Sequence, residues 1–323
     1  MKIIHVKEPG GPEKMELVEV PKPQPGPGQA LVRLAAIGVN FIDVYFRMGR
    51  YKADLPIVLG NEGAGTVESI GPTVTELVAG DRVAFAMQRG SYAEYVVVPV
   101  AMLVKIPPHV SFETAAAAML QGMTAHYLTH STFALKPGDT CLVHAAAGGA
   151  GGLVVQMAKM LGARVFGTVS TEEKARIARE AGADETILYT EQDFEAEVKR
   201  WTAGRGVDVV YDSVGQTTFA KSLDSLRPRG MLALFGQSSG PVPPFDPNIL
   251  NGKGSLFLTR PSLAHYLLSR EELLWRAGDL LQWIDAGKLQ LRIERTYPLA
   301  EAAAAHRDLE SRRTAGKLLL IPQ

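Results

Sequence analysis

Short apolar runs alternate with helix-forming segments through the middle of the chain. The runs begin at Cys141 and continue over residues 163–169, 183–188, 207–211 and 231–235, each bounded by glycine or polar residues. Runs of this kind are typical of strands that are buried on both faces of a sheet. Helices are predicted at residues 153–161, between the first and second of these strands, and at residues 171–181, between the second and third. Strands that alternate with helices predict an α/β fold with a doubly wound parallel sheet.

The chain before residue 121 follows a different pattern. It combines a proline-rich stretch at 21–27 with short alternating segments at 30–35, 66–70 and 92–98, which predict mostly antiparallel strands joined by tight turns. The alanine-rich stretch from residue 112 to residue 132 predicts a helical junction. We therefore expect a β-rich domain over residues 1–121.

The alternation of strands and helices stops after Pro261. Residues 271–286 form one long amphipathic stretch, and strand-like segments follow at 291–296 and 318–321. We expect a nucleotide-binding domain over residues 122–262 and a C-terminal segment, residues 263–323, that folds back onto the first domain.

A glycine-rich turn follows the strand that begins at Cys141. Ala146, Gly148 and Gly151 occupy the three small-residue positions of the dinucleotide fingerprint. Small residues allow a pyrophosphate to approach the backbone, and the N-terminus of the following helix favours negative charge. The alternative is a Gly/Ala turn that serves packing alone. The surrounding alternation of strands and helices favours a dinucleotide site.

Composition and charge exclude several classes of partner. Lys plus Arg and Asp plus Glu both total 34 of 323 residues, so no basic surplus is present to attract nucleic acid or an anionic membrane. The longest apolar stretches are rich in glycine or broken by Pro99, so we expect no membrane span. One cysteine, Cys141, forms no intramolecular disulfide and suits a reducing, cytoplasmic location.

Two motifs suggest other chemistry, and the residues around each argue against it. His126 and His130 have the spacing of a metal-binding pair on a helix, but Tyr127 stands where the metalloprotease motif has glutamate and a third ligand is missing. The run GQSSG at 236–240 matches the serine-hydrolase pattern, but Pro241 opposes the helix that should follow the serine. We expect neither a metal site nor a hydrolase.

Seven motifs distributed along the chain indicate a family. They are GVNFID at 38–43, GNEGAG at 60–65, AGDRV at 79–83, AAAGGAG at 145–151, YDSVG at 211–215, FGQSSG at 235–240 and TRPSL at 259–263. With these motifs the chain resembles the zinc-free quinone oxidoreductases of the medium-chain dehydrogenase/reductase superfamily, which include zeta-crystallin. The resemblance implies a GroES-like β domain with the substrate site, a Rossmann domain with NADPH, an active site in the cleft between them, and a homodimer formed through the Rossmann domain.

The resemblance also explains why zinc is not expected. The zinc-dependent alcohol dehydrogenases place cysteine and histidine ligands where this chain has Asn40 and Asn61. A carboxamide is a poor zinc ligand, and the one cysteine lies elsewhere in the chain.

The end of the second Rossmann strand bears on the choice of coenzyme. NAD-specific domains usually carry an acidic residue there, but this chain has Ser170, followed by Lys174. A hydroxyl and a lysine suit a 2′-phosphate, so we expect NADPH; the alternative is that Lys174 is only a solvated helix residue. The resemblance implies the following cofactor-binding residues: Asn40, Thr124, Ala146, Gly148, Gly149, Ala150, Gly151, Ser170, Lys174, Tyr189, Ser213, Phe235, Gln237, Arg260 and Lys317.

The resemblance implies reduction of a small quinone without a metal. A quinone accepts electrons readily, so positioning beside the nicotinamide can replace a Lewis acid. We assign Asn40 and Tyr45 as catalytic residues that orient the nicotinamide and the quinone, and Asp43 as a residue that holds local backbone structure. Tyr45 either supplies a proton or forms an aromatic wall. Two alternatives remain: an NADPH-dependent reductase of the C=C bond of enals and enones, and a catalytically weak NADPH-binding structural protein.

Overall fold

The computed structural model describes residues 1–322, which form two compact units. The first unit combines Met1–Met123 with the chain from Tyr266 onward, and the second unit is Thr124–His265. These boundaries lie close to residues 121 and 262, where the sequence pattern changes.

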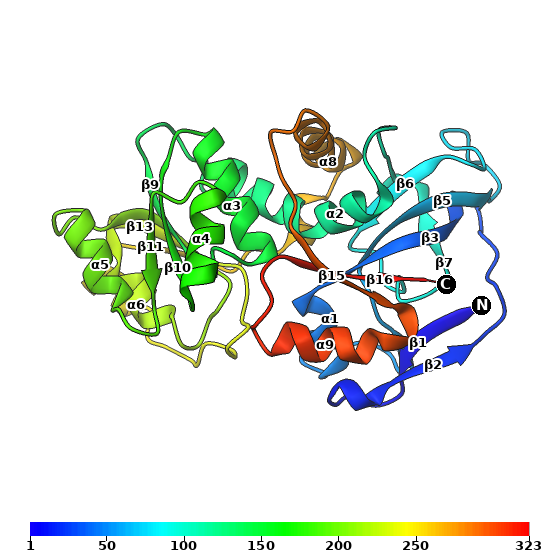
Figure 1. Ribbon diagram of the computed structural model, residues 1–323, viewed down its shortest axis with the longest axis horizontal. Helices are drawn as coiled ribbons and strands as arrows, with labels where there is room; N and C mark the ends of the chain where they lie inside the picture. The colour runs from blue at the N-terminus through cyan, green and yellow to red at the C-terminus, as the bar shows by residue number, and fades with distance from the viewer. Residues whose placement is uncertain (323) are drawn as a thin grey trace. The chain divides into compact units, whose positions relative to one another are not determined.

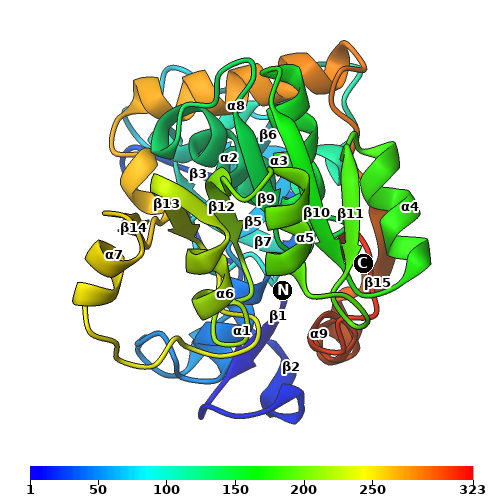
Figure 2. The same cartoon turned by 90° about the vertical axis from the view of Figure 1, so that its left-hand side faces the viewer.

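A six-stranded parallel sheet forms the centre of the second unit, with the strand order β11-β10-β9-β12-β13-β14. Both flanks of the sheet carry helices (Figure 2). The predicted doubly wound parallel sheet is therefore confirmed. Its strands are β9 (Thr140–Val143), β10 (Arg164–Val169), β11 (Glu185–Leu188), β12 (Val207–Asp212), β13 (Leu226–Leu234) and β14 (Phe257–Thr259).

Two helices of this unit begin at a residue whose side chain caps them. Thr171 accepts a hydrogen bond from the backbone N–H of Lys174, and Asp193 accepts one from Glu195, so each satisfies an N–H at a helix start. The helix expected over residues 153–161 begins earlier, because the glycines that follow Gly148 are themselves helical. The helices are α3 (Gly149–Met160), α4 (Glu172–Glu180), α5 (Phe194–Trp201), α6 (Phe219–Asp224) and α7 (Asn248–Gly252).

The first unit is built mainly from antiparallel strands, as the alternating segments of the sequence predict (Figure 1). The longest strand, β3, pairs with β5, β7 and β16, and so organises the larger sheet. The strands of the N-terminal part are β1 (Lys2–Val6), β2 (Met15–Glu19), β3 (Gln29–Val39), β4 (Ile57–Val58), β5 (Glu62–Ile70), β6 (Arg82–Ala86), β7 (Tyr95–Pro99) and β8 (Val104–Lys105).

The C-terminal segment completes the larger sheet of the first unit. Strand β16 (Lys317–Ile321) pairs antiparallel with β3 and parallel with β15 (Ile293–Pro298), so the C-terminal segment adds two strands to this sheet. The expected long helix is α8 (Arg270–Asp285), whereas α9 (Ala302–Glu310) was not predicted. The remaining helices are α1 (Phe41–Arg47) and α2 (Phe112–Tyr127), the latter followed by a π-helical turn over Leu128–Thr132.

The start of α3 lies very close to the backbone of the turn that precedes it. Ala145 adopts a left-handed conformation with φ of 53°, and its carbonyl oxygen accepts a hydrogen bond from the N–H of Gly148. A Cβ atom at Gly151 would lie 2.2 Å from this oxygen, whereas one at Gly152 would meet only the Ala146 oxygen, at 3.5 Å. The two neighbouring glycines therefore differ in their tolerance of a methyl group.

We predict that Gly151→Ala destabilises the protein by about 1–3 kcal/mol, because the methyl group must displace backbone rather than a flexible side chain. Gly152→Ala is the matched control, and we expect it to be neutral or stabilising by about 0.5–1 kcal/mol, since alanine favours a helix over glycine. Urea denaturation of both variants measures the difference. Equal effects of the two substitutions would contradict the close approach of α3 to Ala145.

Candidate functional site

Most of the predicted cofactor residues follow directly after the strands of the parallel sheet. The carboxyl ends of parallel strands meet at one edge of a sheet, where α/β proteins bind their ligands. The turn at 144–148 follows β9 at this edge. The predicted residues there are Ser170 after β10, Tyr189 after β11, Ser213 after β12, Phe235 and Gln237 after β13, and Arg260 after β14.

The glycine turn after β9 has the properties of a pyrophosphate site. Gly148 is the N-cap of α3 and offers no side-chain hydrogen bond, so the first backbone N–H groups of Gly149–Met160 are not capped by a side chain at that position. Ala146 is buried, and a Cβ at Gly148 would lie 3.1 Å from the Ala145 oxygen. Uncapped N–H groups and a backbone without side chains fit a bound pyrophosphate.

The residues around the end of β10 fit an adenosine 2′-phosphate. Ser170 and Lys174 are both half-buried, and Tyr189 is 48 % exposed. The acidic residue Glu172 forms an ion pair with Arg179, which lowers its repulsion of a nearby phosphate. The carboxylate of Glu172 is therefore neutralised by an arginine and does not oppose a phosphate beside Ser170 and Lys174.

The turns after β12 and β13 are hydrogen-bonded to each other. The N–H of Ser238 donates to the oxygen of Ser213, and the N–H of Ser239 donates to the oxygen of Val214. Ser213, Phe235 and Gln237 are all half-buried on these turns. The GQSSG run thus forms turns and no helix follows it directly, so Ser238 does not occupy the strand-to-helix elbow of a serine hydrolase.

In the first unit, strand register brings together three residues that are distant in the sequence. Gly38 pairs with Leu319 of β16, and Ile37 pairs with Gly63 of β5, so Asn40, Glu62 and Lys317 become neighbours. The Lys317 Nζ lies 2.6 Å from Glu62 Oε2 and 2.7 Å from Asn40 Oδ1, and the Asn40 Nδ2 donates to Glu62 Oε2 at 2.8 Å. Lys317 is 2 % exposed and Glu62 is fully buried, so this ion pair is excluded from water.

Gly38 provides the space for this ion pair. A Cβ atom at Gly38 would lie 2.0 Å from Glu62 Oε2. Both polar atoms of the Asn40 carboxamide are held by the pair, since Nδ2 donates to Glu62 and Oδ1 accepts from Lys317. The orientation of Asn40 is therefore fixed by a buried carboxylate and a buried ammonium group.

Asp43 connects the start of α1 to the strand beside it. Its carboxylate accepts hydrogen bonds from the backbone N–H of Asn40 at 2.9 Å, from Asn61 Nδ2 at 2.7 Å and from the Tyr92 hydroxyl at 3.3 Å. Burial raises the pKa of Asp43 to about 6, although the hydrogen bonds from Asn61 and Asn40 oppose the shift. Asp43 thus holds the local backbone, the role expected from the sequence.

A second chain of polar groups continues from Tyr92 to α9. The Tyr92 hydroxyl lies 2.9 Å from His306 Nε2, and Arg47 Nη1 lies 2.8 Å from His306 Nδ1. Because arginine only donates, Nδ1 accepts, and Nε2 carries the proton and donates to Tyr92. Burial lowers the pKa of His306 to about 3, so the ring is neutral. Arg47 also binds both carboxylate oxygens of Glu310 at 2.9 Å.

Tyr45, the second predicted catalytic residue, lies on α1 with 5 % of its surface exposed. Its ring centroid is 5.4 Å from that of Tyr51 and 6.3 Å from that of Phe41. Tyr45 is therefore part of an aromatic cluster as well as a carrier of a hydroxyl group.

The predicted residues divide between the two units. Asn40, Tyr45 and Lys317 belong to the first unit, and the other predicted site residues, including Thr124 on α2, belong to the second. The roles of Glu62, Arg47 and His306 were missed. For Glu62 a signal was available, because a carboxylate in the apolar, glycine-rich run at 60–65 must find a buried partner.

The two histidines on α2 and its continuation lie against each other. The rings of His126 and His130 are stacked with centroids 4.2 Å apart. Within residues 1–322, no group of three or more His, Cys, Asp or Glu side chains is arranged to hold a metal ion. Cys141 is a buried free thiol whose pKa is raised by burial.

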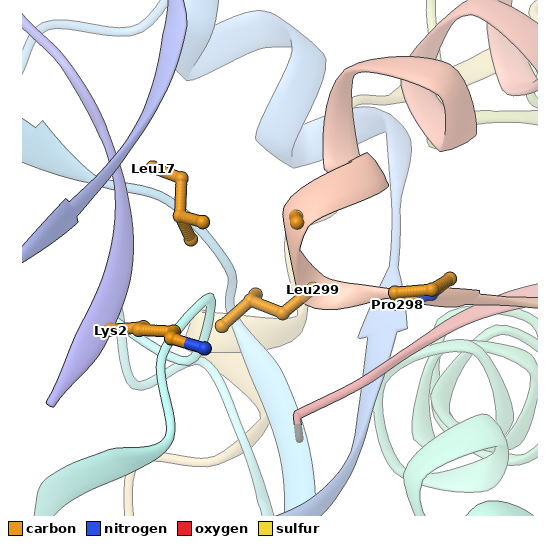
Figure 3. Close-up of a pocket in the computed structure, with 5 residues that line it drawn as sticks. Lys2, Leu17, Pro298 and Leu299 are labelled. Atoms are coloured by element: carbon orange, nitrogen blue, oxygen red, sulfur yellow. The ribbon is translucent and has the colours of Figure 1, made fainter.

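One small surface pocket lies in the first unit (Figure 3). It has a volume of about 40 Å³ and is lined by Lys2, Leu17 and the segment 298–300. This space is large enough for water molecules but too small for a nicotinamide or quinone ring. No helix within residues 1–322 has the length and apolarity needed to cross a lipid bilayer.

Comparisons with known proteins agree with a β-rich first unit and a second unit built on a parallel sheet. Residues 26–108 match the family model described as alcohol dehydrogenase GroES-like domain, and residues 181–320 match the model described as zinc-binding dehydrogenase. The chain is 47 % identical to a quinone oxidoreductase of Pseudomonas aeruginosa over 315 residues, covering 97 % of each chain. It is 46 % identical to a 2-haloacrylate reductase of a Burkholderia species over 329 residues, covering 99 % of this chain and 98 % of the other.

A solved structure is equally similar over its whole length. The quinone oxidoreductase of Escherichia coli, in complex with NADPH, superposes with a TM-score of 0.98 at 43 % identity, and the match covers 100 % of both chains. The fold, the glycine turn and the identity along the full length lead to one conclusion: this chain belongs to the zeta-crystallin-like quinone oxidoreductases of the medium-chain dehydrogenase/reductase superfamily.

Proposed function

We propose that this protein is an NADPH-dependent reductase of small quinones. The observation that carries the proposal is full-length identity to quinone oxidoreductases, one of them solved with NADPH, in a chain whose cofactor residues follow the strands of one parallel sheet. NADPH, when bound, supplies hydride from its nicotinamide ring. The residues of this chain bind and orient the reactants.

We assign the second unit to coenzyme binding. The turn after β9 offers backbone N–H groups to the pyrophosphate, and Ser170, Lys174 and Tyr189 bind the adenosine phosphate. The remaining proposed cofactor residues there are Thr124, Ser213, Phe235, Gln237 and Arg260. Lys317 and Asn40 of the first unit are assigned to the nicotinamide half of the coenzyme.

We assign substrate orientation to Asn40 and Tyr45. The buried pair of Glu62 and Lys317 fixes the Asn40 carboxamide, and Asp43 holds the backbone at the start of α1. The Tyr45 hydroxyl donates a hydrogen bond to a quinone oxygen as negative charge develops there. Catalysis then depends on proximity and orientation more than on a strong acid or base.

A second candidate is reduction of an activated C=C bond. The observation that favours it is the 46 % identity to a 2-haloacrylate reductase, which is almost as high as the 47 % identity to the quinone oxidoreductase of Pseudomonas aeruginosa. We predict that NADPH oxidation at 340 nm is faster with 1,4-benzoquinone and 9,10-phenanthrenequinone than with 2-chloroacrylate or a simple enone. Dominant turnover of the alkenes would establish the second candidate, and no turnover with any of them would favour a binding role.

The Tyr45→Phe variant, tested on the same substrates, separates the two roles considered for Tyr45. Loss of the hydroxyl lowers kcat for quinones by about 10-fold or more if Tyr45 donates to the developing charge. An unchanged kcat would show that the ring acts only as a wall and that water supplies the proton.

We predict that Lys174→Ala raises the KM for NADPH by roughly 10-fold to 100-fold, the worth of a charge-assisted hydrogen bond, and leaves the KM for NADH unchanged. Arg176→Ala is the matched control, because Arg176 lies on the same helix and pairs with Glu180. Steady-state kinetics with both coenzymes provide the measurement. Equal losses for NADPH and NADH would refute contact with the 2′-phosphate.

We propose that two copies associate through the second unit. Strand β14 is at the edge of the parallel sheet, where it pairs with β13 among the described residues, and Phe257 on this strand is 57 % exposed. An open edge with an apolar side chain favours pairing with a second strand. We also propose a cytoplasmic location, since the one cysteine is a buried thiol without a disulfide.

We predict that Phe257→Asp converts a dimer into a monomer, because it places a charge in the proposed interface. Leu274→Asp, on α8 of the first unit, is a control with a similarly exposed side chain. Light scattering coupled to gel filtration gives the mass of each variant. A monomeric wild type, or a Phe257→Asp variant that remains dimeric, would exclude this interface.

A further inference from the structure

His144 occupies the point where the strands of the parallel sheet separate. Strand β9 lies between β10 and β12, and its last backbone pairs are Val143 with Gly167 on one side and Val143 with Tyr211 on the other (Figure 2). His144 is the next residue and directly precedes the glycine turn. The strand order reverses between β9 and β12, and doubly wound sheets bind their ligands at the carboxyl edge at such a point.

Side chains continue the connection where the backbone pairing ends. His144 Nδ1 lies 2.9 Å from Thr168 Oγ1 on β10, and His144 Nε2 lies 2.9 Å from Ser222 Oγ on α6. Ser222 Oγ donates to Asp212 Oδ2 at the end of β12, at 3.0 Å. All four side chains are at least 99 % buried, so a single chain of hydrogen bonds links β10, β9, α6 and β12 away from water.

The chain of hydrogen bonds has one direction. Ser222 has one hydroxyl proton, which it gives to Asp212, so its oxygen accepts from His144 and Nε2 carries the proton. In a neutral ring Nδ1 is then the acceptor, and Thr168 donates to it. Burial lowers the pKa of His144, in agreement with a neutral ring.

The same groups determine the shape of the turns that follow the strands. Asp212 Oδ1 accepts from the N–H groups of Val214 and Gly215, at 2.8 and 3.0 Å, and so shapes the turn that carries Ser213. The backbone oxygen of Thr168 accepts from the N–H of Ala146 in the glycine turn. His144 therefore connects the glycine turn after β9 to the end of β10 and, through Ser222 and Asp212, to the turn after β12.

We propose that His144 is a positioning residue for the coenzyme. Its ring holds the glycine turn, the end of β10 and the turn after β12 at the spacing that one dinucleotide requires, without touching the coenzyme. This role rests on the proposed function, in which the second unit binds NADPH. A hydrolytic role for the His, Ser and Asp is excluded by the order of the bonds, because a nucleophilic serine gives its proton to histidine, whereas Ser222 gives its proton to aspartate.

The test uses Thr168→Val and Ser222→Ala in the full-length protein, which remove the two hydroxyls bound to the His144 ring. Each variant removes one of the two contacts that fix the ring, so we expect the Kd of NADPH and that of NADH to rise together by about 10-fold for each variant, with kcat at saturating coenzyme changed less than threefold. Because both act through one ring, the double variant should lose less than the product of the single effects.

Thr202→Val is the matched control. Its hydroxyl donates to the oxygen of Val198 at 2.7 Å and accepts from the N–H of Gly206 at 2.9 Å, and Gly206 immediately precedes β12, at the opposite edge of the sheet. This variant loses hydrogen bonds in the same unit, so we expect a lower melting temperature with an unchanged Kd for both coenzymes.

A nitrogen-15 spectrum of the His144 ring supplies a second readout. We expect one protonated nitrogen, Nε2, in the wild type, and a change confined mainly to the unprotonated Nδ1 in Thr168→Val. Variants that bind both coenzymes as tightly as the wild type, despite lower melting temperatures, would reduce His144 to a structural residue and overturn the proposal. A wild-type protein that binds no NADPH would instead overturn the proposed function itself. If Thr168→Val does not fold, the Kd values of Ser222→Ala for NADPH and NADH are the test of the proposal.

Discussion

The buried ion pair between Lys317 and Glu62 is the interaction on which the first unit depends. It joins the last strand of the chain to β5 and holds the Asn40 carboxamide at the end of β3. Removing two charges from water costs several kcal/mol per ion, and loss of one partner from such a pair typically costs about 3–5 kcal/mol. The pair persists because hydrogen bonds satisfy both groups and because Gly38 leaves room for the carboxylate.

The sequence predicts the parallel sheet well because each strand there is a local pattern. A short apolar run, a turn and a helix can be recognised from neighbouring residues, and the carboxyl ends of parallel strands always share one edge. This is why residues as far apart as Ser170 and Gln237, which follow β10 and β13, lie after strands that end at the same edge of the sheet.

The polar network of the first unit could not be predicted in the same way. It depends on the register of antiparallel strands, in which Leu318 pairs with Val39, and a shift of one residue would turn Lys317 to the other face. The pairing of His306 with Arg47 depends in addition on α9, whose sequence is rich in alanine and gives no clear sign of its partner. The resemblance identified Asn40 and Lys317, but neither their contact nor the role of Glu62, which binds both.

Two buried histidines serve the same physical purpose in the two units. His306 and His144 each accept a hydrogen bond at Nδ1 and donate one at Nε2, so their neighbours fix both the tautomer and the ring orientation. Burial lowers the pKa of both, to about 3 for His306, and keeps the rings neutral near pH 7. A neutral ring with both nitrogens bound transmits position and exchanges no proton. Hydride transfer to a quinone, which requires alignment more than acid or base strength, is the kind of reaction that such rigid supports assist.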